Sequence, residues 1–255
     1  MILSEKIINW LASYLDENNL SCFVVGISGG IDSAVVSTLC SLTGKKTIVV
    51  TLPIHQNENQ YKLAKKHIDW LRLNFSNVSS LDIDLTNLFE NYKKIFPGSD
   101  DLSLANTRSR LRMTTLYQIA SMNNNRGIVV GTGNKIEDFG IGFFTKYGDG
   151  GVDISPIGDL NKSEVRSLGK QLGVIEEIIL AKPTDGLWDD NRNDEDQIGA
   201  TYEELEKIMD MLSLHSESYL YQNLKGRDQE VLITYLDFHK KNKHKMINIP
   251  VFKNN

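Results

Sequence analysis

The sequence contains little cysteine and no long hydrophobic run. These two features argue against a cysteine-based metal or redox site and against a membrane span. Cys22 and Cys40 are the only cysteines among 255 residues, and they form no C-x-x-C pair of the kind found in zinc sites and redox dithiols. Both lie among apolar residues, so we expect small buried side chains in a reducing, cytoplasmic setting. No apolar run approaches the roughly 18 residues of a membrane span. Residues 1–18 have an amphipathic helical pattern, not that of a signal peptide.

The chain also lacks a strong charge imbalance. Its net charge is -5 and 24% of its residues are charged, so we expect no broad attraction to nucleic acid, and basic side chains can serve phosphates only in local clusters. A hydrophobic content of 40% is typical of globular proteins. No internal repeat or low-complexity linker interrupts the sequence. We therefore expect residues 1–255 to form a single domain.

Short β-branched runs alternate with helical patterns over the first two thirds of the chain. The expected strands are residues 22–27, 47–52, 78–84, 127–132 and, as a short fifth strand, 152–157. The expected helices are residues 33–42, 57–73, 86–95, 102–122 and 162–172. This alternation predicts an α/β fold of three layers, with a mostly parallel five-stranded sheet flanked by helices. After about residue 173 the pattern predicts a helical C-terminal portion, interrupted by an acidic segment, 185–196, that we interpret as a solvated loop.

A loop of small residues joins the first expected strand to the next helix, with the sequence Gly26-Ile27-Ser28-Gly29-Gly30-Ile31-Asp32-Ser33. A strand, a glycine turn and a helix N-terminus together form a cradle for anions. Asp32 can hold a magnesium ion against phosphates. The loop lacks the lysine and the spacing of the common P-loop. It resembles the S-G-G-x-D-S loop of the ATP pyrophosphatases, which cut ATP between the α- and β-phosphates and pass AMP to a substrate.

Two further segments follow the fourth expected strand. Thr132 leaves a hydroxyl at the end of that strand, and Glu137 lies about one helical turn further on. Glu137 can offer a second carboxylate to a cation, or it can simply interact with a helix dipole. Downstream, Lys146 lies in a segment, 142–153, that holds four glycines and two aspartates. This composition favours a mobile loop that carries a cation over a phosphate site.

Together these segments resemble the NAD synthetases. The resemblance extends over nearly the whole chain and is carried by segments 26–33, 131–132, 143–153, 155–156, 160–162, 182–184, 194–202 and 244–245. Segment 106–113, with the sequence N-T-R-S-R-L-R-M, is similar to the family's N-x-x-A-R-x-R-M motif. The resemblance covers only the synthetase part, so we expect no nitrilase-like glutaminase domain. The resemblance therefore implies the short, ammonia-dependent form, with the fold of the adenine nucleotide α-hydrolases.

The resemblance implies a reaction and its components. The family converts deamido-NAD (nicotinic acid adenine dinucleotide) to NAD with ATP and ammonia, through an acyl-adenylate, and releases AMP and pyrophosphate. This is the last step of NAD biosynthesis. The implied cofactor is Mg²⁺, and the implied partners are deamido-NAD, ATP, ammonia and a second copy of the chain. The helix at residues 102–122 is a plausible dimer contact, and no nucleic acid or membrane is expected.

The resemblance also assigns residues. ATP is expected to contact Gly26, Ile27, Ser28, Gly29, Gly30, Ile31, Asp32, Ser33, Thr132, Lys162 and Thr184. Deamido-NAD is expected to contact Arg110, Lys146, Asp153, His244 and Lys245, with Arg112 as a weaker alternative to Arg110. Asp32 and Glu137 are the expected metal ligands, and Asp32 and Lys146 the expected catalytic residues. Segment 132–146 is one residue longer than the common form, so Asp138 competes with Glu137 as a ligand.

Several simpler interpretations stay open at this point. The arginines of segment 106–113 can form a solvated basic face, Lys162 can cap a helix, and His244-Lys245 can belong to an exposed terminal basic run. Another ATP pyrophosphatase, such as a GMP synthetase ATPase domain or a tRNA-modifying ligase, is a second hypothesis. The chain, however, has neither a large basic surface nor paired cysteines. A nucleotide-binding regulator without catalysis is a third hypothesis, but it would require neither Asp32 nor the Lys146 loop.

Overall fold

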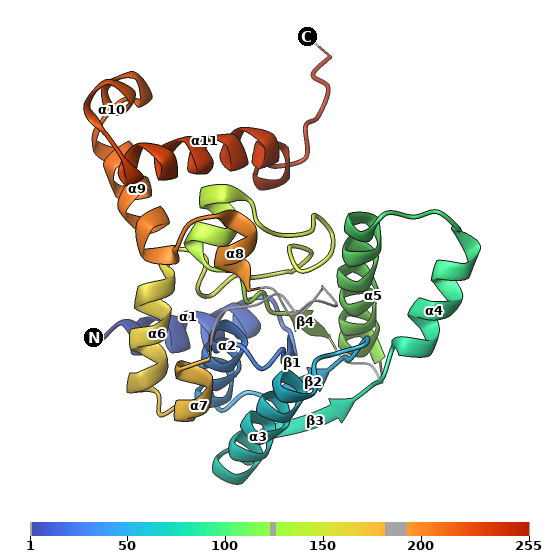
Figure 1. Cartoon of the computed structure of the whole chain (residues 1–255). Helices are drawn as coiled ribbons and strands as arrows, with labels where there is room; N and C mark the ends of the chain where they lie inside the picture. Colours follow the sequence, from blue (N-terminus) through green and yellow to red (C-terminus); the bar gives the residue numbers. More distant parts are fainter. Residues whose placement is uncertain (1, 123–125, 182–192, 255) are drawn as a thin grey trace.

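A parallel sheet lies at the centre of the computed structural model, which describes residues 2–122, 126–181 and 193–254 (Figure 1). Within these residues the sheet has four strands in the order β3-β2-β1-β4. They are β1 (Cys22–Gly26), β2 (Thr47–Thr51), β3 (Val78–Asp82) and β4 (Gly127–Val129). Strands β1 and β2 are buried over nearly their whole length, as expected when helices cover both faces of a parallel sheet.

Helices cover both faces of this sheet. One face packs on α1 (Leu3–Glu17), α2 (Ile31–Leu42), α3 (Glu58–Asn74), α6 (Lys162–Gln171) and α7 (Glu176–Ile179). The other face packs on α4 (Thr86–Ile95) and α5 (Asp101–Ser121). Successive β1 side chains alternate between the two cores: Phe23 and Val25 enter the first, and Cys22 and Val24 the second. The expected three-layer α/β fold is confirmed, and the expected helices are present with their ends shifted by two residues or fewer.

The expected fifth strand at residues 152–157 does not form, so the prediction of five strands was wrong. This segment makes only an isolated parallel bridge between Val130 and Ile154. Asp153 N donates to Val129 O at 2.9 Å and Gly131 N donates to Ile154 O at 2.7 Å. Beyond them comes Pro156, which has no N–H to continue a ladder, and the chain turns.

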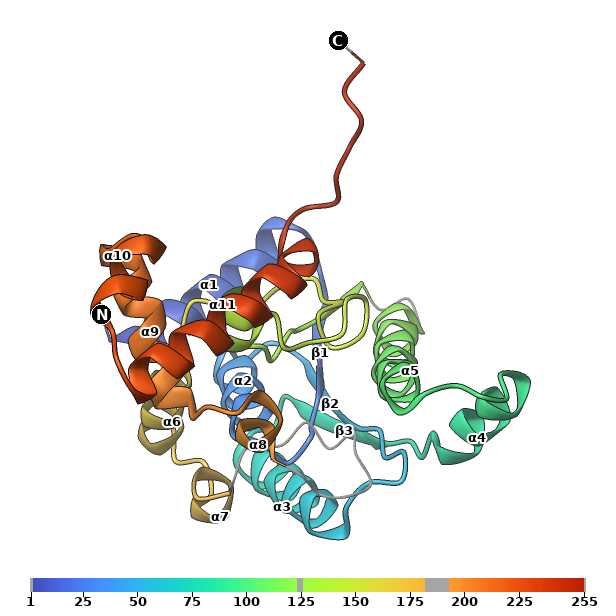
Figure 2. The ribbon, with the colours of Figure 1, turned by 45° about the horizontal axis from the view of Figure 1, so that its top comes forward.

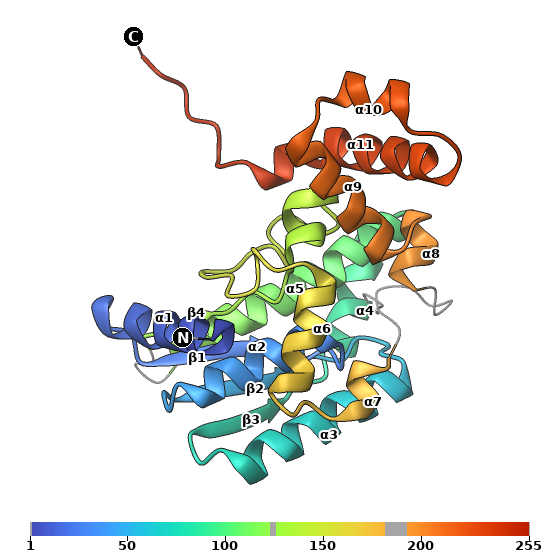
Figure 3. The ribbon, with the colours of Figure 1, turned by 90° about the vertical axis from the view of Figure 1, so that its left-hand side faces the viewer.

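The C-terminal part is helical, as expected. It contains α8 (Asp194–Ile198), α9 (Tyr202–Leu214), α10 (Glu217–Asn223) and α11 (Arg227–Met246). Figure 3 shows these helices gathered above one end of the sheet. Their apolar residues form a third core with η2, a π-helix at Ile136–Ile141. Figure 2 shows the segment after α11 running away from the rest of the chain.

Part of the acidic segment departs from the solvated loop that we expected. Residues 185–192 lie outside the described residues, but 194–196 begin α8 behind the N-cap Asn193. Asp194 is buried, so the solvated-loop interpretation was wrong for this residue. Cys22 and Cys40 are both free and buried, as expected. None of the helices in the described ranges is long and apolar enough to cross a membrane.

Candidate active site

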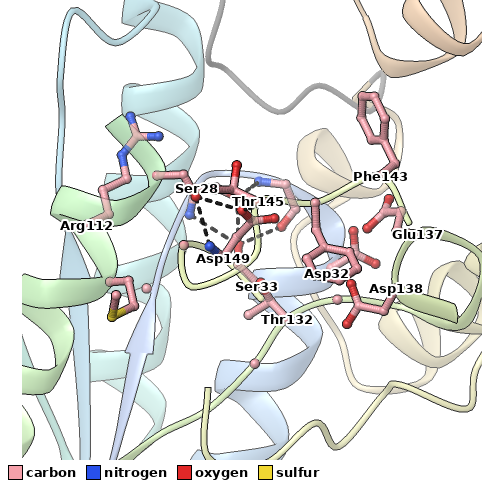
Figure 4. Close-up of a pocket in the computed structure, with 18 of the residues that line it drawn as sticks. Ser28, Asp32, Ser33, Arg112, Thr132, Glu137, Asp138, Phe143, Thr145 and Asp149 are labelled. Carbon is pink, nitrogen blue, oxygen red and sulfur yellow. Dashed lines mark hydrogen bonds between the residues drawn. The ribbon is translucent and has the colours of Figure 1, made fainter. Parts of the chain in front are cut away.

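A cavity of about 900 Å³ opens where the strands end and the C-terminal helices begin (Figure 4). Its walls come from β1, β2, α5, the loops after β4 and the start of α6. In parallel sheets, ligands bind at the carboxyl ends of strands, and the cavity has that position. The expected site residues that line it are Gly26, Ile27, Ser28, Gly29, Gly30, Ile31, Asp32, Ser33, Arg110, Thr132, Glu137, Lys146, Lys162, His244 and Lys245.

The small-residue loop between β1 and α2 is held by its own hydroxyl groups. Ser33 Oγ accepts from Ser28 N at 3.3 Å and donates to Gly30 O at 3.0 Å. Ser28 Oγ accepts from Gly30 N at 3.2 Å. Gly29 has a φ of +91°, and a Cβ atom there would collide with the carbonyl oxygen of Gln60. The loop is therefore shaped before any ligand arrives, with the N-terminus of α2 directed at the cavity.

Lys162 joins two carboxylates at the floor of the cavity. Its Nζ atom lies 2.5 Å from Asp32 Oδ2 and 2.9 Å from Glu137 Oε1, and the lysine side chain is only 3% exposed. Burial alone would lower the pKa of Lys162, but the two carboxylates outweigh burial and raise it above the ordinary value. The three residues come from α2, η2 and α6, so three separate elements meet at this point.

Asn134 contacts the carboxylate of Asp32 and the backbone of Glu137. Its Nδ2 atom lies 3.5 Å from Asp32 Oδ1, and its Oδ1 atom accepts from Glu137 N at 3.2 Å. Asn134 is itself buried. Lys162 therefore links the two carboxylates directly, and Asn134 links the Asp32 carboxylate to the Glu137 backbone.

The donor set around Lys162 suits a magnesium ion. Asp32 and Glu137 supply hard carboxylate oxygens, and both already face one cation, the Lys162 ammonium. Within the described ranges, no three His, Cys, Asp or Glu side chains gather closely enough to hold a metal by themselves. Mg²⁺ is usually held by one or two carboxylates together with substrate phosphates. A magnesium ion bound here would therefore need oxygen ligands from the nucleotide.

Asp138 has different surroundings from Glu137. Its carboxylate covers Gly133 so closely that a Cβ atom at that glycine would collide with it. Burial, and then the charge of Glu137, raise the pKa of Asp138 well above its ordinary value. Glu137 is the one of the two that shares Lys162 with Asp32. The geometry therefore favours Glu137 as the metal ligand.

Basic residues from three elements meet at the rim of the cavity. Arg110 on α5 donates to Lys146 O from Nε and Nη2, at 3.4 and 3.3 Å. Lys146 Nζ donates to His244 O on α11 at 3.0 Å, and Lys245 Nζ donates to Phe144 O at 2.7 Å. The expected dinucleotide-binding residues Arg110, Lys146, His244 and Lys245 therefore lie together, although they are far apart in the sequence.

The loop that carries Lys146 is tied to α5 at its base. Asp149 Oδ1 accepts from Ser109 Oγ at 2.6 Å and from Thr145 N at 3.0 Å. Thr145 Oγ1 donates to Asn106 Oδ1 at 2.7 Å. A Cβ atom at Gly148 would collide with Ser109. These contacts fix the base of the loop, while the expected mobility of its tip stays a prediction.

Not every expected residue lies on the cavity. The Asp153 carboxylate faces the sheet and accepts from Tyr117 OH at 3.0 Å and from Val129 N at 2.7 Å. Arg112 lines the cavity, but it donates to Leu52 O at 3.0 Å and to Gln56 Oε1 at 2.9 Å. Thr184 lies outside the described residues.

A family model described as NAD synthase matches residues 3–248. The chain belongs to the NAD synthase family. A protein of Carboxydothermus hydrogenoformans named NH(3)-dependent NAD(+) synthetase is 41% identical over 208 residues, 81% of this chain and 84% of that protein. A protein of the same name from Methanosarcina acetivorans is 34% identical over 256 residues, 96% of this chain and 95% of its own. Among solved structures, an NMN synthetase from Francisella tularensis has a TM-score of 0.85 at 31% identity, with 99% of this chain and 98% of that chain covered.

Segment 132–146, which we expected to be one residue longer than the common form, contains the π-helix η2 at Ile136–Ile141. A π-helix holds more residues per turn than an α-helix, and single π-turns are frequent at functional sites. η2 ends at Gly142, whose φ is +64°, and Phe143 N donates back to Glu137 O at 2.8 Å. Helix α11 holds the turn: His239 Nδ1 lies 2.7 Å from Gly140 O, and Asn242 donates to Ile141 O at 2.9 Å.

Sequence reasoning gave no role to two residues that complete the floor of the NAD synthase site. Asn134 lies inside a segment that we singled out, and its place after a strand that ends in Gly-Thr was a usable signal. Tyr202 also lies in a segment that carries the family resemblance, 194–202, but nothing in that segment links it to Glu137, which is 65 residues away and accepts from the Tyr202 hydroxyl at 2.6 Å. Only the packing of the C-terminal helices brings it there.

Proposed function

We propose that this chain joins ammonia to the nicotinate carboxylate of deamido-NAD, using ATP and releasing AMP and pyrophosphate. The observation that carries the proposal is the single cavity that joins a phosphate loop, a carboxylate pair and a basic rim. Membership of the NAD synthase family, and relatives named NH(3)-dependent NAD(+) synthetase, support the same reaction.

The chemistry explains why all three parts are needed. A carboxylate resists attack by ammonia, so one of its oxygens first attacks the α-phosphorus of ATP, and the bond to the bridging oxygen of pyrophosphate breaks. The N–H groups of loop 26–33 and the ammonium of Lys162 stabilise the charge on the phosphates. Mg²⁺, held by Asp32 and Glu137, supplies further positive charge when it is bound. Ammonia then attacks the acyl carbon of the adenylate, AMP leaves, and the amide nitrogen loses a proton.

The basic rim orients the dinucleotide. The Arg110 guanidinium can grip phosphate oxygens with its planar fork, and Lys146, His244 and Lys245 add positive or polar groups beside it. A loop that closes with Lys146 would exclude water from the adenylate, which water would otherwise hydrolyse. The expected contacts of Asp153 and Thr184 with ligands rest on the family resemblance alone.

Exposed apolar side chains support assembly into a homodimer. Leu88, Tyr92 and Ile95 lie on α4, Phe96 follows directly after it, and Leu102 lies at the start of α5; these side chains are 41–67% exposed. A patch of this kind marks a protein contact in a folded chain. We propose that residues 1–255 act as one ammonia-dependent unit within such a dimer. The free, buried cysteines are compatible with the reducing cytoplasm.

A second candidate function is amidation of the corresponding mononucleotide. It is favoured by the likeness to the Francisella tularensis protein, which is named an NMN synthetase and is 31% identical. Both reactions use the same nicotinate carboxylate and the same adenylation, so the floor of the site serves either. The two reactions differ in their substrate: deamido-NAD carries a second nucleotide that the basic rim would contact, and the mononucleotide does not.

The proposal is tested by product analysis with both substrates. Purified protein is mixed with ATP, Mg²⁺ and ammonium, and with either deamido-NAD or nicotinate mononucleotide. We expect NAD, AMP and pyrophosphate in equal amounts, with the larger kcat/KM for the dinucleotide. Formation of ADP and phosphate would exclude the adenylation route, and a larger kcat/KM for the mononucleotide would favour the second candidate.

A further inference from the structure

We propose that Tyr202 is a positioning residue for the carboxylate of Glu137. Its hydroxyl fixes that carboxylate in the orientation that a divalent cation bound with ATP needs. The inference rests on the proposed function, because it takes Glu137 as a ligand of that cation. It assigns a task in the reaction to the C-terminal helices, from which Tyr202 comes.

Tyr202 and Lys162 grip the same oxygen of Glu137. The Tyr202 hydroxyl donates to Oε1 at 2.6 Å, and Lys162 Nζ approaches this atom at 2.9 Å. Lys162 Nζ also lies 4.7 Å from the centroid of the Tyr202 ring, where the face of the ring attracts a cation. If the Glu137 carboxylate rotated, it would lose both donors, so the pair fixes its orientation.

The phenol is itself held rigidly. Tyr202 is 0% exposed and opens α9 directly after the N-cap Thr201. Its backbone N–H donates to Glu195 Oε1 at 3.1 Å, and its hydroxyl lies 3.2 Å from Asp194 Oδ2. Both acidic residues belong to α8. Tyr202 is therefore buried at the start of α9 and bonded to α8 through both its backbone N–H and its hydroxyl. In this way the position of α8 and α9 determines where the hydroxyl meets Glu137.

Glu137 needs this support because its backbone belongs to a π-helix. Such turns are rare, and this one is held from outside by side chains of α11 at Gly140 and Ile141. Side chains of α11 hold the backbone of η2, and Tyr202 holds the side chain of Glu137. Residues that orient metal ligands in this way commonly change metal affinity by about 10- to 100-fold when they are substituted.

The chain offers a matched control in Tyr235. This tyrosine on α11 lies in the same apolar core and is 5% exposed. Its hydroxyl has no hydrogen bond to any other residue within the part of the chain that the structure describes. Tyr235→Phe therefore removes a hydroxyl from the same core without touching Glu137, Lys162 or Asp194. Tyr202→Phe keeps the ring, its packing and its contact with Lys162.

The experiment measures metal binding without turnover. Mn²⁺ is titrated into wild-type protein, Tyr202→Phe and Tyr235→Phe in the presence of α,β-methylene-ATP, and free Mn²⁺ is followed by electron paramagnetic resonance. We expect Tyr202→Phe to bind Mn²⁺ about tenfold more weakly and Tyr235→Phe to stay within about twofold of the wild type. In the full reaction, excess Mg²⁺ should restore most of the kcat of Tyr202→Phe, because only the affinity is reduced.

Two results would overturn the inference. One is a Tyr202→Phe variant that binds Mn²⁺ as tightly as the wild type. The other is an equal loss in both variants, which would point to core packing. Failure of the proposed function is distinguishable: wild-type protein would then form no NAD, while a selective loss of Mn²⁺ binding in Tyr202→Phe would still support the positioning role.

Discussion

The Nζ atom of Lys162 lies 2.5 Å from Oδ2 of Asp32, although 130 residues separate the two in the sequence. Lys162 opens α6 and Asp32 lies in the first turn of α2. Their contact links the phosphate loop to the second half of the chain. It also places an ammonium beside the carboxylate that is expected to hold magnesium.

Asp32→Asn should abolish turnover with the fold preserved. The amide keeps the size of the side chain but removes a negative charge from the proposed metal site, so we expect kcat to fall by a factor on the order of 1000. The measurement is steady-state rate together with circular dichroism. Asp159→Asn is the control, because the Asp159 side chain is 95% exposed and pairs with Lys135 at the surface. Wild-type rates in Asp32→Asn would remove Asp32 from the mechanism.

Lys162→Met should destabilise the metal-free protein. Without the ammonium, the Asp32 and Glu137 side chains, each only 16% exposed, face each other as like charges, and losing one partner of a buried ion pair costs about 3–5 kcal/mol. Mg²⁺ should recover part of this loss, because it binds the folded state only. Urea unfolding in EDTA and in Mg²⁺ tests both statements. A variant that is as stable as the wild type in EDTA would contradict them.

Lys146→Ala should lose rate and keep stability. The Lys146 side chain is partly exposed and donates only to the His244 carbonyl among the described residues, so we expect a stability change within about 0.5 kcal/mol. If the lysine contacts the substrate, kcat/KM for deamido-NAD should fall by at least about tenfold. Thermal melting and initial rates are compared. Unchanged rates with unchanged melting would show that Lys146 takes no part in substrate binding or catalysis.

Arg110→Gln should weaken dinucleotide binding. A charge-assisted hydrogen bond contributes about 1.5–3 kcal/mol, so the KM for deamido-NAD should rise about tenfold or more, while the KM for ATP changes little. Arg72→Gln is the control, because Arg72 is exposed near the end of α3, away from the cavity. Equal KM values for deamido-NAD in both variants would place Arg110 outside the binding site.

Stability should fall in mild acid because of His67. This residue is 0% exposed, its Nε2 atom lies 2.9 Å from Ser37 Oγ, and its ring stacks on Trp70. Burial lowers the pKa of His67 from 6.5 to about 4. As the pH falls, His67 is protonated in the unfolded chain before it is protonated in the folded protein. The contribution of neutral His67 to the free energy of unfolding is therefore fully present above pH 6.5 and is lost as the pH falls toward 4. The shift corresponds to roughly 3 kcal/mol.

Urea unfolding between pH 7.5 and 4.5 measures how the free energy of unfolding depends on pH. His67→Gln removes the titrating group while keeping a polar partner for Ser37, so its stability should depend less on pH than that of the wild type over the same interval. Identical slopes in the two proteins would show that His67 does not carry the acid sensitivity.

Local patterns predicted most of the fold. Strands β1 and β2 are short β-branched runs between helices, and α4 begins and ends at the residues expected, Thr86 and Ile95. The fifth strand failed because alternation alone does not reveal that Pro156 and the Asp153 side chain cut the ladder short. Local sequence could not predict η2, because a π-turn depends on the distant side chains of α11 that hold it.

The site was predictable to the extent that its residues lie in compact motifs. Segment 26–33 and the surroundings of Lys146 carry their chemistry in adjacent residues. The meeting of Asp32, Glu137 and Lys162 follows from sheet topology, which brings the ends of the strands together. Tyr202 could not be predicted, because its role depends on one hydroxyl that reaches across two packed elements.

Oxygen transfer from the nicotinate carboxylate to AMP is the most direct measurement of the proposed adenylation. Deamido-NAD labelled with ¹⁸O in that carboxylate is converted by the wild-type protein with ATP, Mg²⁺ and ammonium, and the products are analysed by mass spectrometry. The predicted result is one labelled oxygen in each AMP and one retained in the amide of NAD. AMP without label would contradict an acyl-adenylate and the role proposed here for the cavity.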